Sequence, residues 1–392
     1  MMLHILGRQP ELGLAELNSL YGSARMFGRE AAITDSSDFD IQSVGGVQKS
    51  GNITMEIPHT NWPAINKAIF SHYYKIWSKS NKKITLGISV YGSTNIRPKQ
   101  INALSQSLKQ ALKKSDISVR TIPNKSAALN TATSHHNKLG LNPHKIELII
   151  AQDSSRTLVA ESTGAQNITA LAKRDQGRPK RDAFVGMLPP KLALMMINMA
   201  AGSKSNKQRV SSTPTLLDPF CGTGVILQEA LLQGYSVYGS DLSDKMISYS
   251  KTNLDWLQNT HRTKGKIIHL HQSDATNAKW KNPSDISLVV CEAYLGQPFS
   301  ATPSSSKLKE VRGNCNSIIS SFLKNIGEQI QPGTKFTVAV PAWRDLNTKR
   351  ITRLPLVKQL DNLGYSQINT QPLLYYRDDQ IVARDILVFE KN

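Results

Sequence analysis

The feature that most constrains this chain is a short glycine turn, residues 218–224 (DPFCGTG), which separates an apolar strand-like segment from a helix-like one. From residue 215 onward, strand-like and helix-like segments alternate along the sequence. The pattern predicts strands at 216–217, 236–240, 266–271, 286–291 and 335–340, and helices at 224–233, 243–259, 315–331 and 353–362. Two more strand-like segments, 367–376 and 381–390, follow. This alternation predicts an α/β fold, a doubly wound sheet that ends in an antiparallel closing strand pair.

The residues around the turn indicate a nucleotide-like ligand. Gly222 and Gly224 allow a tight turn and close approach of the backbone to a ligand. Leu227 stands where a phosphate-binding loop would carry its third glycine, and no Gly-Lys-Ser/Thr follows, so neither common phosphate-binding loop is present. Asp241 ends the next predicted strand, about twenty residues on, where an acid accepts hydrogen bonds from ribose hydroxyls. Asp274 follows the third strand, where a carboxylate can meet an adenine amine.

Positive charge is concentrated in one part of the chain. The whole chain carries a formal charge of +19. Residues 58–146 contain fourteen Lys or Arg but a single acid, Asp116, and therefore account for +13 of that charge. Such a stretch is typical of a surface that contacts the phosphate backbone of a nucleic acid, largely without reading its sequence. A basic surface that only keeps the protein in solution is the alternative interpretation.

The first part of the chain shows a different pattern, which predicts an α+β domain. Helices are expected at 10–20 and 100–114, and strands at 31–34, 83–91, 117–122, 146–151 and 157–161. Residues 47–55 are strand-like but interrupted by Gly51. Residues 171–190 read as a linker that enters a helix at 191–201, and 201–214 as an exposed loop. We therefore expect an N-terminal domain over 1–165, a linker and helix over 166–200, and a second domain over 201–392.

Cysteine and histidine usage excludes several classes of protein. The three cysteines form no Cys-x-x-Cys pair, which argues against a zinc ribbon or a thioredoxin-like motif and favours a reducing compartment. No acid or cysteine completes a metal site near the histidine pairs at 135–136 and 269/271, so no metal site is expected. No signal peptide and no membrane-spanning stretch is expected, and the predicted location is the cytoplasm.

The turn also resembles a known motif. Residues 218–224 resemble the S-adenosylmethionine-binding motif of amino-methyltransferases that act on nucleic acid. The resemblance implies S-adenosylmethionine as cofactor, and a set of residues that hold it: Asp218, Phe220, Gly222, Gly224, Asp241 and Asp274. The alternatives are another nucleotide site of the Rossmann type, or a turn without a ligand.

The whole chain resembles the THUMP-containing tRNA guanine-N2 methyltransferases of archaea and eukaryotes, which modify guanosine at tRNA position ten. The resemblance rests on residues 5–17 (ILGRQPELGLAEL), 178–182 (RPKRD), 187–193 (MLPPKLA), and 375–377 with 382–388 in a closing hairpin. It implies a THUMP-like RNA-binding region over 1–165, a Rossmann-like methyltransferase domain over 201–392, and tRNA as the partner. Residues 166–200 are then expected to help close the cofactor pocket. A small activating subunit, which the eukaryotic members need, stays open.

The catalytic segment departs from the family pattern. These enzymes place Asp or Asn, two prolines and an aromatic residue after the fourth strand. The polar side chain and a backbone carbonyl then accept the N–H bonds of the amine, and the aromatic ring stacks on the base. This chain has Cys291, Glu292, Ala293 and Tyr294 there. Cysteine is a weak hydrogen-bond partner, so Glu292 is the alternative acceptor, although neighbouring side chains of a strand point to opposite faces.

This departure leaves four interpretations open. The first is methylation of the N2 amine of a guanosine in tRNA. The second is an RNA-binding homologue whose methyltransferase domain is impaired in catalysis. A third keeps the methyltransferase but changes its substrate to rRNA or DNA. The fourth treats Cys291 as a nucleophile, as in cytosine-C5 methyltransferases, which instead carry Pro-Cys where this chain has Val290 before the cysteine.

Overall fold

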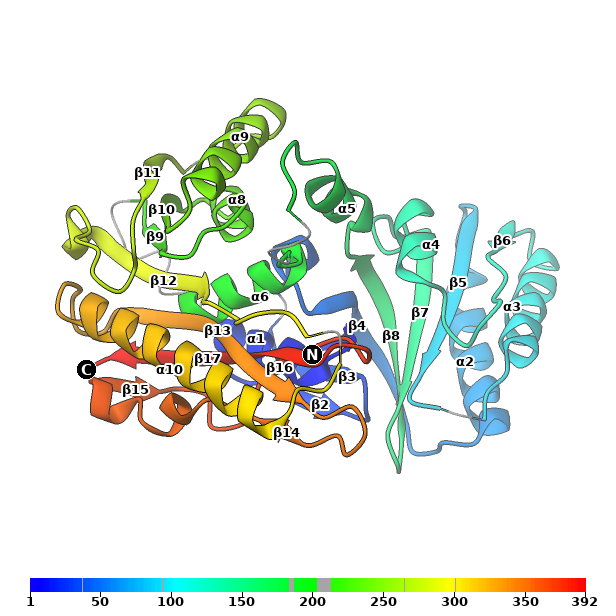
Figure 1. Cartoon of the computed structure of the whole chain (residues 1–392). Helices are drawn as coiled ribbons and strands as arrows, with labels where there is room; N and C mark the ends of the chain where they lie inside the picture. Colours follow the sequence, from blue (N-terminus) through cyan, green and yellow to red (C-terminus); the bar gives the residue numbers. More distant parts are fainter. Residues whose placement is uncertain (37, 94, 183–186, 203–212, 264, 300) are drawn as a thin grey trace. The chain divides into compact units, whose positions relative to one another are not determined.

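The computed structural model describes residues 1–392 except 37, 94, 183–186, 203–212, 264 and 300 (Figure 1). The chain divides into two compact units, Met1–Ala172 and Lys173–Asn392. No helix in the described part of the chain is long and apolar enough to cross a membrane. The prediction of a loop over 201–214 lies mostly outside the described residues.

The N-terminal unit is a mixed sheet with helices. Its sheet has the strand order β2-β3-β1-β4-β8-β7-β5-β6, in which β5 pairs parallel with β6 and β7 and the other neighbours are antiparallel. The strands are β1 (Met2–Leu6), β2 (Arg25–Phe27), β3 (Ala31–Thr34), β4 (Val47–Ile57), β5 (Ile84–Tyr91), β6 (Val119–Thr121), β7 (Lys145–Gln152) and β8 (Thr157–Ala165). The helices are α1 (Pro10–Tyr21), η1 (Ile41–Ser43), α2 (Trp62–Trp77), α3 (Pro98–Lys113), α4 (Thr131–His136) and α5 (Ile168–Gln176).

Most of the expected elements of this unit are confirmed, and two are corrected. Strand β4 continues through Gly51, although its register against β8 shifts between Ser50 and Gly51. A side chain at Gly51 would meet the Glu161 carbonyl oxygen of β8 at 2.6 Å. The glycine therefore permits close strand pairing and does not end the strand. Helix α2 was not predicted. Its buried face carries Trp62 and Trp77 at its two ends, so the aromatic residues mark a helix core. Helix α5 likewise occupies part of the predicted linker.

The C-terminal unit confirms the doubly wound sheet with an antiparallel edge. The main strand order is β11-β10-β9-β12-β13-β17-β15; β14 pairs with β13, and β16 with β17. The strands are β9 (Thr215–Asp218), β10 (Ser236–Asp241), β11 (Ile267–Gln272), β12 (Ile286–Glu292), β13 (Lys335–Arg344), β14 (Ile351–Thr352), β15 (Tyr365–Gln367), β16 (Leu374–Tyr375) and β17 (Val382–Lys391). The helices are α6 (Pro190–Ala201), α8 (Val225–Leu232), α9 (Asp244–Thr260), η2 (Pro283–Asp285), α10 (Ser305–Gly327), η3 (Pro355–Lys358) and η4 (Asp361–Leu363).

The order of the parallel strands fixes where a ligand can bind. The chain moves outward from β9 to β10 and β11, and then returns to place β12 on the other side of β9. The connection after β9 therefore runs toward one edge of the sheet, to β10, and the connection after β12 runs toward the other edge, to β13. A crevice forms outside the carboxyl ends of strands at such a reversal.

Helices cover both faces of this sheet. Helix α10 packs its buried face, including Cys315, Ile319 and Phe322, against β12, β13 and β17 (Figure 1). Helix α6 is buried along most of its length and contacts β12, β13, β17 and α8. Because both faces are covered, the central strands are almost continuously apolar, as expected for a parallel sheet.

Two predictions for the C-terminal unit are wrong. The expected helix at 353–362 is two short 3-10 turns, η3 and η4. The first turn ends at Gln359, whose φ of −130° and ψ of 13° lie outside the helical region, so the segment does not continue as one helix. The expected strand at 367–376 is reduced to its two ends, β15 and β16. Between these two short strands, the Asn369 side chain accepts a hydrogen bond from the Val388 N–H of β17.

Candidate active site

A cavity of about 860 Å³ opens at the carboxyl ends of β9, β10, β11 and β12. It lies at the reversal of strand order. Its volume falls in the range of about 300–1,000 Å³ that is usual for small-molecule sites. Its walls include five of the six predicted cofactor residues (Asp218, Phe220, Gly222, Asp241 and Asp274) and three of the four predicted catalytic residues (Glu292, Ala293 and Tyr294).

The glycine turn between β9 and α8 has the conformation that its sequence predicts. Gly222 and Gly224 have φ angles of 51° and 81°, which other residues rarely adopt. A side chain at Gly222 would meet nothing within 4 Å, whereas one at Gly224 would approach the Ser250 hydroxyl at 2.9 Å. Gly222 thus lines the cavity with bare backbone, and Gly224 allows α9 to pack against the turn.

Asp241 connects the turn to the end of β10. Its Oδ2 accepts the Gly222 N–H at 2.9 Å, and its Oδ1 accepts the Ser243 N–H at 2.9 Å. A carboxylate has about four acceptor sites, so two remain for a ligand. The position suits a pair of hydroxyl groups, such as those of a ribose.

Asp218 and Asp274 differ in their surroundings. Asp218 is almost fully buried, and its Oδ1 accepts the Phe220 N–H at 3.1 Å. Burial raises the pKa of Asp218 well above its usual range, and the nearby charges of Asp241 and Glu292 raise it further. Asp274 uses Oδ1 to accept both the N–H and the hydroxyl of Thr276, at 2.9 and 2.8 Å. Its second oxygen is available to an amine donor.

A contact that sequence reasoning missed ties the segment before the domain to the turn. The buried Asn253 side chain of α9 accepts the Lys180 N–H and donates to the carbonyls of Lys180 and Thr223, each at 2.9 Å. Asp182 of the same segment pairs with Lys245 at 2.9 Å. The only sequence signal for this role is a polar residue on the buried face of a helix.

The catalytic segment is divided between two faces of β12. Cys291 has no exposed surface, packs in the α10 core and does not line the cavity. Burial raises the pKa of its thiol well above the usual range, which disfavours the nucleophilic thiolate. Glu292 faces the cavity, and the Ala293 N–H donates to the Ala339 carbonyl at 3.0 Å. Tyr294 remains 41% exposed at the cavity wall.

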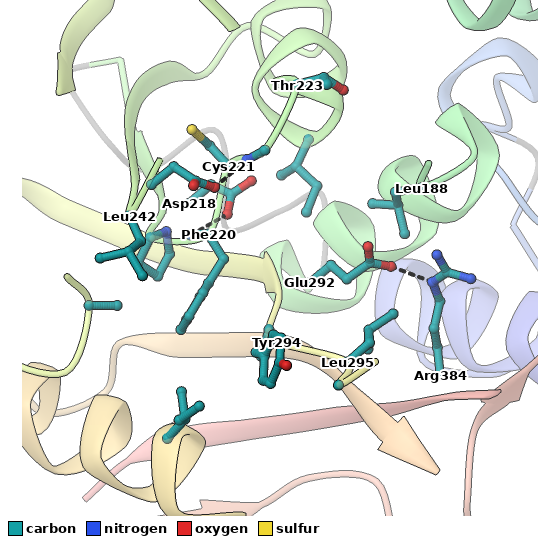
Figure 2. A pocket seen from close by; sticks show the side chains of 18 of the residues that line it. Leu188, Asp218, Phe220, Cys221, Thr223, Leu242, Glu292, Tyr294, Leu295 and Arg384 are labelled. Carbon is teal, nitrogen blue, oxygen red and sulfur yellow. Dashed lines mark hydrogen bonds and ion pairs between the residues drawn. The ribbon is translucent and has the colours of Figure 1, made fainter. Parts of the chain in front are cut away.

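Arg384 of β17 lines the cavity, and the sequence did not identify it as a site residue. Its Nε donates to Oε1 of Glu292 in an ion pair that spans the cavity wall (Figure 2). The one indication in the sequence that Arg384 belongs to the site was the resemblance of residues 382–388 to a hairpin of the family. Arg344 is not among the residues that line the cavity; it is buried and donates to the carbonyls of Arg377 and Gln380 at 2.8 and 3.0 Å.

The described residues contain no group of three His, Cys, Asp or Glu side chains that could hold a metal ion. The carboxylate oxygens of Asp241 and Asp274 can accept hydrogen bonds from hydroxyl and amine groups of a ligand, and with the backbone of Gly222 they fit the adenosine part of S-adenosylmethionine.

The strand order, the glycine turn and the acids at successive strand ends define the C-terminal unit as a Rossmann-like methyltransferase domain. S-adenosylmethionine is its cofactor, as the sequence predicted. Residues 178–317 match the model of the UPF0020 family, described as RMKL-like, methyltransferase domain.

Two archaeal relatives are both tRNA (guanine(10)-N2)-dimethyltransferases. The one from Methanothermobacter thermautotrophicus is 30% identical over 176 residues, which is 44% of this chain and 45% of the relative. The one from Methanocaldococcus jannaschii is 36% identical over 130 residues, which is 32% of this chain and 34% of the relative. The aligned part of the chain therefore spans less than half the length of each relative.

Solved structures share the fold over nearly the whole chain. TrmN from Thermus thermophilus has a TM-score of 0.54 at 14% identity and covers 100% of both chains. A possible methylase from Clostridium difficile has a TM-score of 0.53 at 11% identity and covers 100% of this chain and 97% of its own. At these identities the likeness concerns the fold alone.

Proposed function

We propose that this protein transfers a methyl group from S-adenosylmethionine to the exocyclic N2 amine of a guanosine in tRNA. The observation that carries the proposal is a single cavity that joins the acids of the cofactor turn to a carboxylate and an exposed aromatic ring, Glu292 and Tyr294. The names of the archaeal relatives support the substrate class.

In this proposal, the turn and the acids hold the cofactor. Asp241 accepts hydrogen bonds from the ribose hydroxyls, and Asp274 accepts one from the adenine amine. The bare backbone of Gly222 allows the cofactor to approach closely. Asp218 and Phe220 shape the wall between them, and Gly224 supports the turn through its contact with α9. The cofactor supplies a methyl group that is activated by attachment to a sulfonium.

The protein's part in the transfer is to orient a poor nucleophile. The lone pair of the N2 amine is delocalised into the guanine ring, so hydrogen bonds that favour a pyramidal amine help the attack. Glu292 and the Ala293 carbonyl accept hydrogen bonds from the two N–H groups of the amine. Tyr294 stacks on the base after the base has left the RNA helix. Because Cys291 is buried away from the cavity, we assign it a packing role and give the acceptor role to Glu292.

The N-terminal unit supplies the electrostatic attraction for RNA. Twelve of the fourteen basic residues between 58 and 146 are exposed, the exceptions being the half-buried Lys109 and Lys145. Among the described residues, none of the fourteen forms an ion pair within the protein. Their charge is therefore available to a phosphate backbone. The THUMP-like assignment of this unit, the cytoplasmic location and the need for an activating subunit stay predictions.

The proposal is tested by incubating the purified protein with labelled S-adenosylmethionine and unmodified bulk tRNA, followed by nucleoside mass spectrometry. N2-methylguanosine or its dimethyl form is the expected product. Glu292→Ala should abolish its formation, whereas the matched exposed variant Glu310→Ala on α10 should not. Label on another nucleoside would refute the proposed substrate atom.

One observation favours a second candidate, an RNA-binding homologue without catalysis: the family's acid or amide position holds a cysteine that lies in the core. Binding of both S-adenosylhomocysteine and tRNA without any methyl transfer would support this candidate. Transfer to rRNA or DNA in the same assay would point instead to a different substrate.

A further inference from the structure

The cavity wall contains a carboxylate and a guanidinium fixed against each other. Glu292 comes from the end of β12 and Arg384 from β17, and Figure 2 shows the two side chains pointing toward each other. Both side chains are mostly buried, with exposed fractions of 17% and 10%. Both line the cavity next to Ala293 and Tyr294. A pair in this place is part of the wall that a substrate base would touch.

Neighbouring contacts hold the guanidinium in position. The Arg384 guanidinium carbon lies 6.0 Å from the centre of the Tyr375 ring. The next residue, Asp385, is fully buried and accepts from Arg353 at 2.5 and 3.1 Å. At Arg384 the strand β17 also pairs with Pro341 of β13 on one side and with Tyr375 of β16 on the other, so the fork of donors is presented in a set direction.

The pair leaves hydrogen-bonding groups unused. Only Nε of Arg384 and Oε1 of Glu292 bond to each other. Within the described part of the chain, the two Nη groups of Arg384 and Oε2 of Glu292 have no other hydrogen-bond partner. Oε1 also keeps a second acceptor site. A base edge that lies across this pair would therefore meet a donor on Arg384 and then acceptor sites on the two Glu292 oxygens, the series donor, acceptor, acceptor.

This series complements one base edge. The Watson–Crick edge of guanine presents the O6 acceptor, the N1–H donor and the N2 amine donor, whereas adenine presents an amine donor and the N1 acceptor. We propose that Arg384 and Glu292 together select guanine, with Arg384 donating to O6 while Glu292 accepts from N1–H and from the N2 amine. This inference rests on the proposed function, because it deepens that function's choice of base.

The arrangement also explains rejection of other bases. Adenine would place its N1 lone pair against a carboxylate oxygen and its amine against the guanidinium, leaving polar groups of a partly buried pair unsatisfied. A site built to hydrogen-bond a donor discriminates strongly against an analogue that lacks it. If the pair only stabilised the fold, the rate of methylation would not depend on which groups the edge of the base presents.

The test uses a base that keeps the methyl-accepting amine but changes the rest of the edge. 2,6-Diaminopurine retains the 2-amine, replaces O6 by an amine and carries an acceptor at N1. The modified guanosine is first located by mass spectrometry, and RNA is then made with guanosine or 2,6-diaminopurine at that position. We expect kcat/KM of the wild type to favour guanosine by roughly 100-fold, the effect of about two lost base contacts.

Variants assign this preference to Arg384. Arg384→Met should lower kcat/KM for guanosine by roughly 30- to 100-fold and leave 2,6-diaminopurine within a few-fold, so that the preference collapses. Arg384→Lys keeps the charge beside Glu292 but loses the fork, and should give an intermediate preference. Arg377→Met, an exposed arginine of the same hairpin, is the matched control and should keep the full preference. Thermal unfolding checks that each variant is folded.

The outcomes separate this inference from the proposed function. If the wild type methylates both bases equally, or if Arg384→Met lowers both rates by the same factor, the inference is wrong while the function stands. If no guanosine is methylated, the function fails. The preference is then measured, in the presence of S-adenosylhomocysteine, as the affinity for two short single-stranded RNAs that differ only in carrying one guanosine or one 2,6-diaminopurine. Equal affinity for the two RNAs in that measurement would overturn the inference as well.

Discussion

Asp241 offers the sharpest test of how the cofactor is held. Its carboxylate has two acceptor sites left after bonding the N–H groups of Gly222 and Ser243. Two hydroxyl groups that bond a carboxylate contribute about 1.5–3 kcal/mol each. Since Asp241 is partly exposed, the lower value applies to each bond, which gives about 3 kcal/mol in total, or roughly a 100-fold change in Kd.

The assay is isothermal titration with S-adenosylhomocysteine. Asp241→Ala should raise Kd by roughly 100-fold, and Asp241→Asn, which keeps one acceptor oxygen, by roughly tenfold. Asp244→Asn removes the same charge from an exposed residue at the start of α9 and should leave Kd within about twofold, since exposed charges interact weakly through water.

A ligand variant separates a direct bond from a disturbed turn. The 2′-deoxy form of S-adenosylhomocysteine should bind the wild type more weakly than the parent compound, yet bind Asp241→Ala about equally well. The ribose assignment would be refuted if both proteins lost the same factor on removal of the hydroxyl. A Kd for Asp241→Ala within about threefold of the wild type would refute it as well.

Three further predictions follow from the same unit and its neighbour. Asn253→Ala removes three hydrogen bonds and should lower the free energy of unfolding by about 2–3 kcal/mol and weaken the binding of S-adenosylhomocysteine. The exposed control Asn259→Ala should change neither quantity. Melting curves measure the stability, and isothermal titration measures the binding. The raised pKa of Asp218 means that its contribution to stability is complete below the unfolded pKa of 3.8 and is lost as pH rises toward the folded pKa. Asp218→Asn should therefore gain stability relative to the wild type between pH 4 and pH 7, and a flat difference in chemical denaturation would contradict this. Paired alanines at the exposed Lys82 and Lys83 should weaken tRNA binding at low salt and flatten its salt dependence, while Lys358→Ala should not; a salt titration of tRNA affinity tests this.

Much of the C-terminal fold could be predicted from local patterns. The alternation of strand and helix and the glycine turn predicted the β9–β12 arrangement, because the strand-like and helix-like segments alternate regularly there and are separated by clear turns. Prediction failed where a segment depends on distant contacts. The 353–362 segment has helix-like composition, but its ion pair from Arg353 to Asp385 and its buried leucines anchor it as turns.

The catalytic segment shows the same division. The sequence predicted which residues follow the fourth strand, and it named both Cys291 and Glu292 as acceptors. It could not choose between them, since strand alternation tells only that they face opposite sides, and not which side is the cavity. Helix α10, which begins about a dozen residues later in the chain, packs over the cysteine face and leaves the other to the ligand.

The sequence by itself determined the class of domain, the cofactor and the acids that line the cavity, because these follow from short motifs at the ends of successive strands. Only the tertiary structure brought Arg384, 92 residues away in the chain, against Glu292 in the cavity wall. That contact depends on the antiparallel pairing of β17 with β13, and such pairing is set by the packing of the whole sheet. No local pattern of residues encodes it.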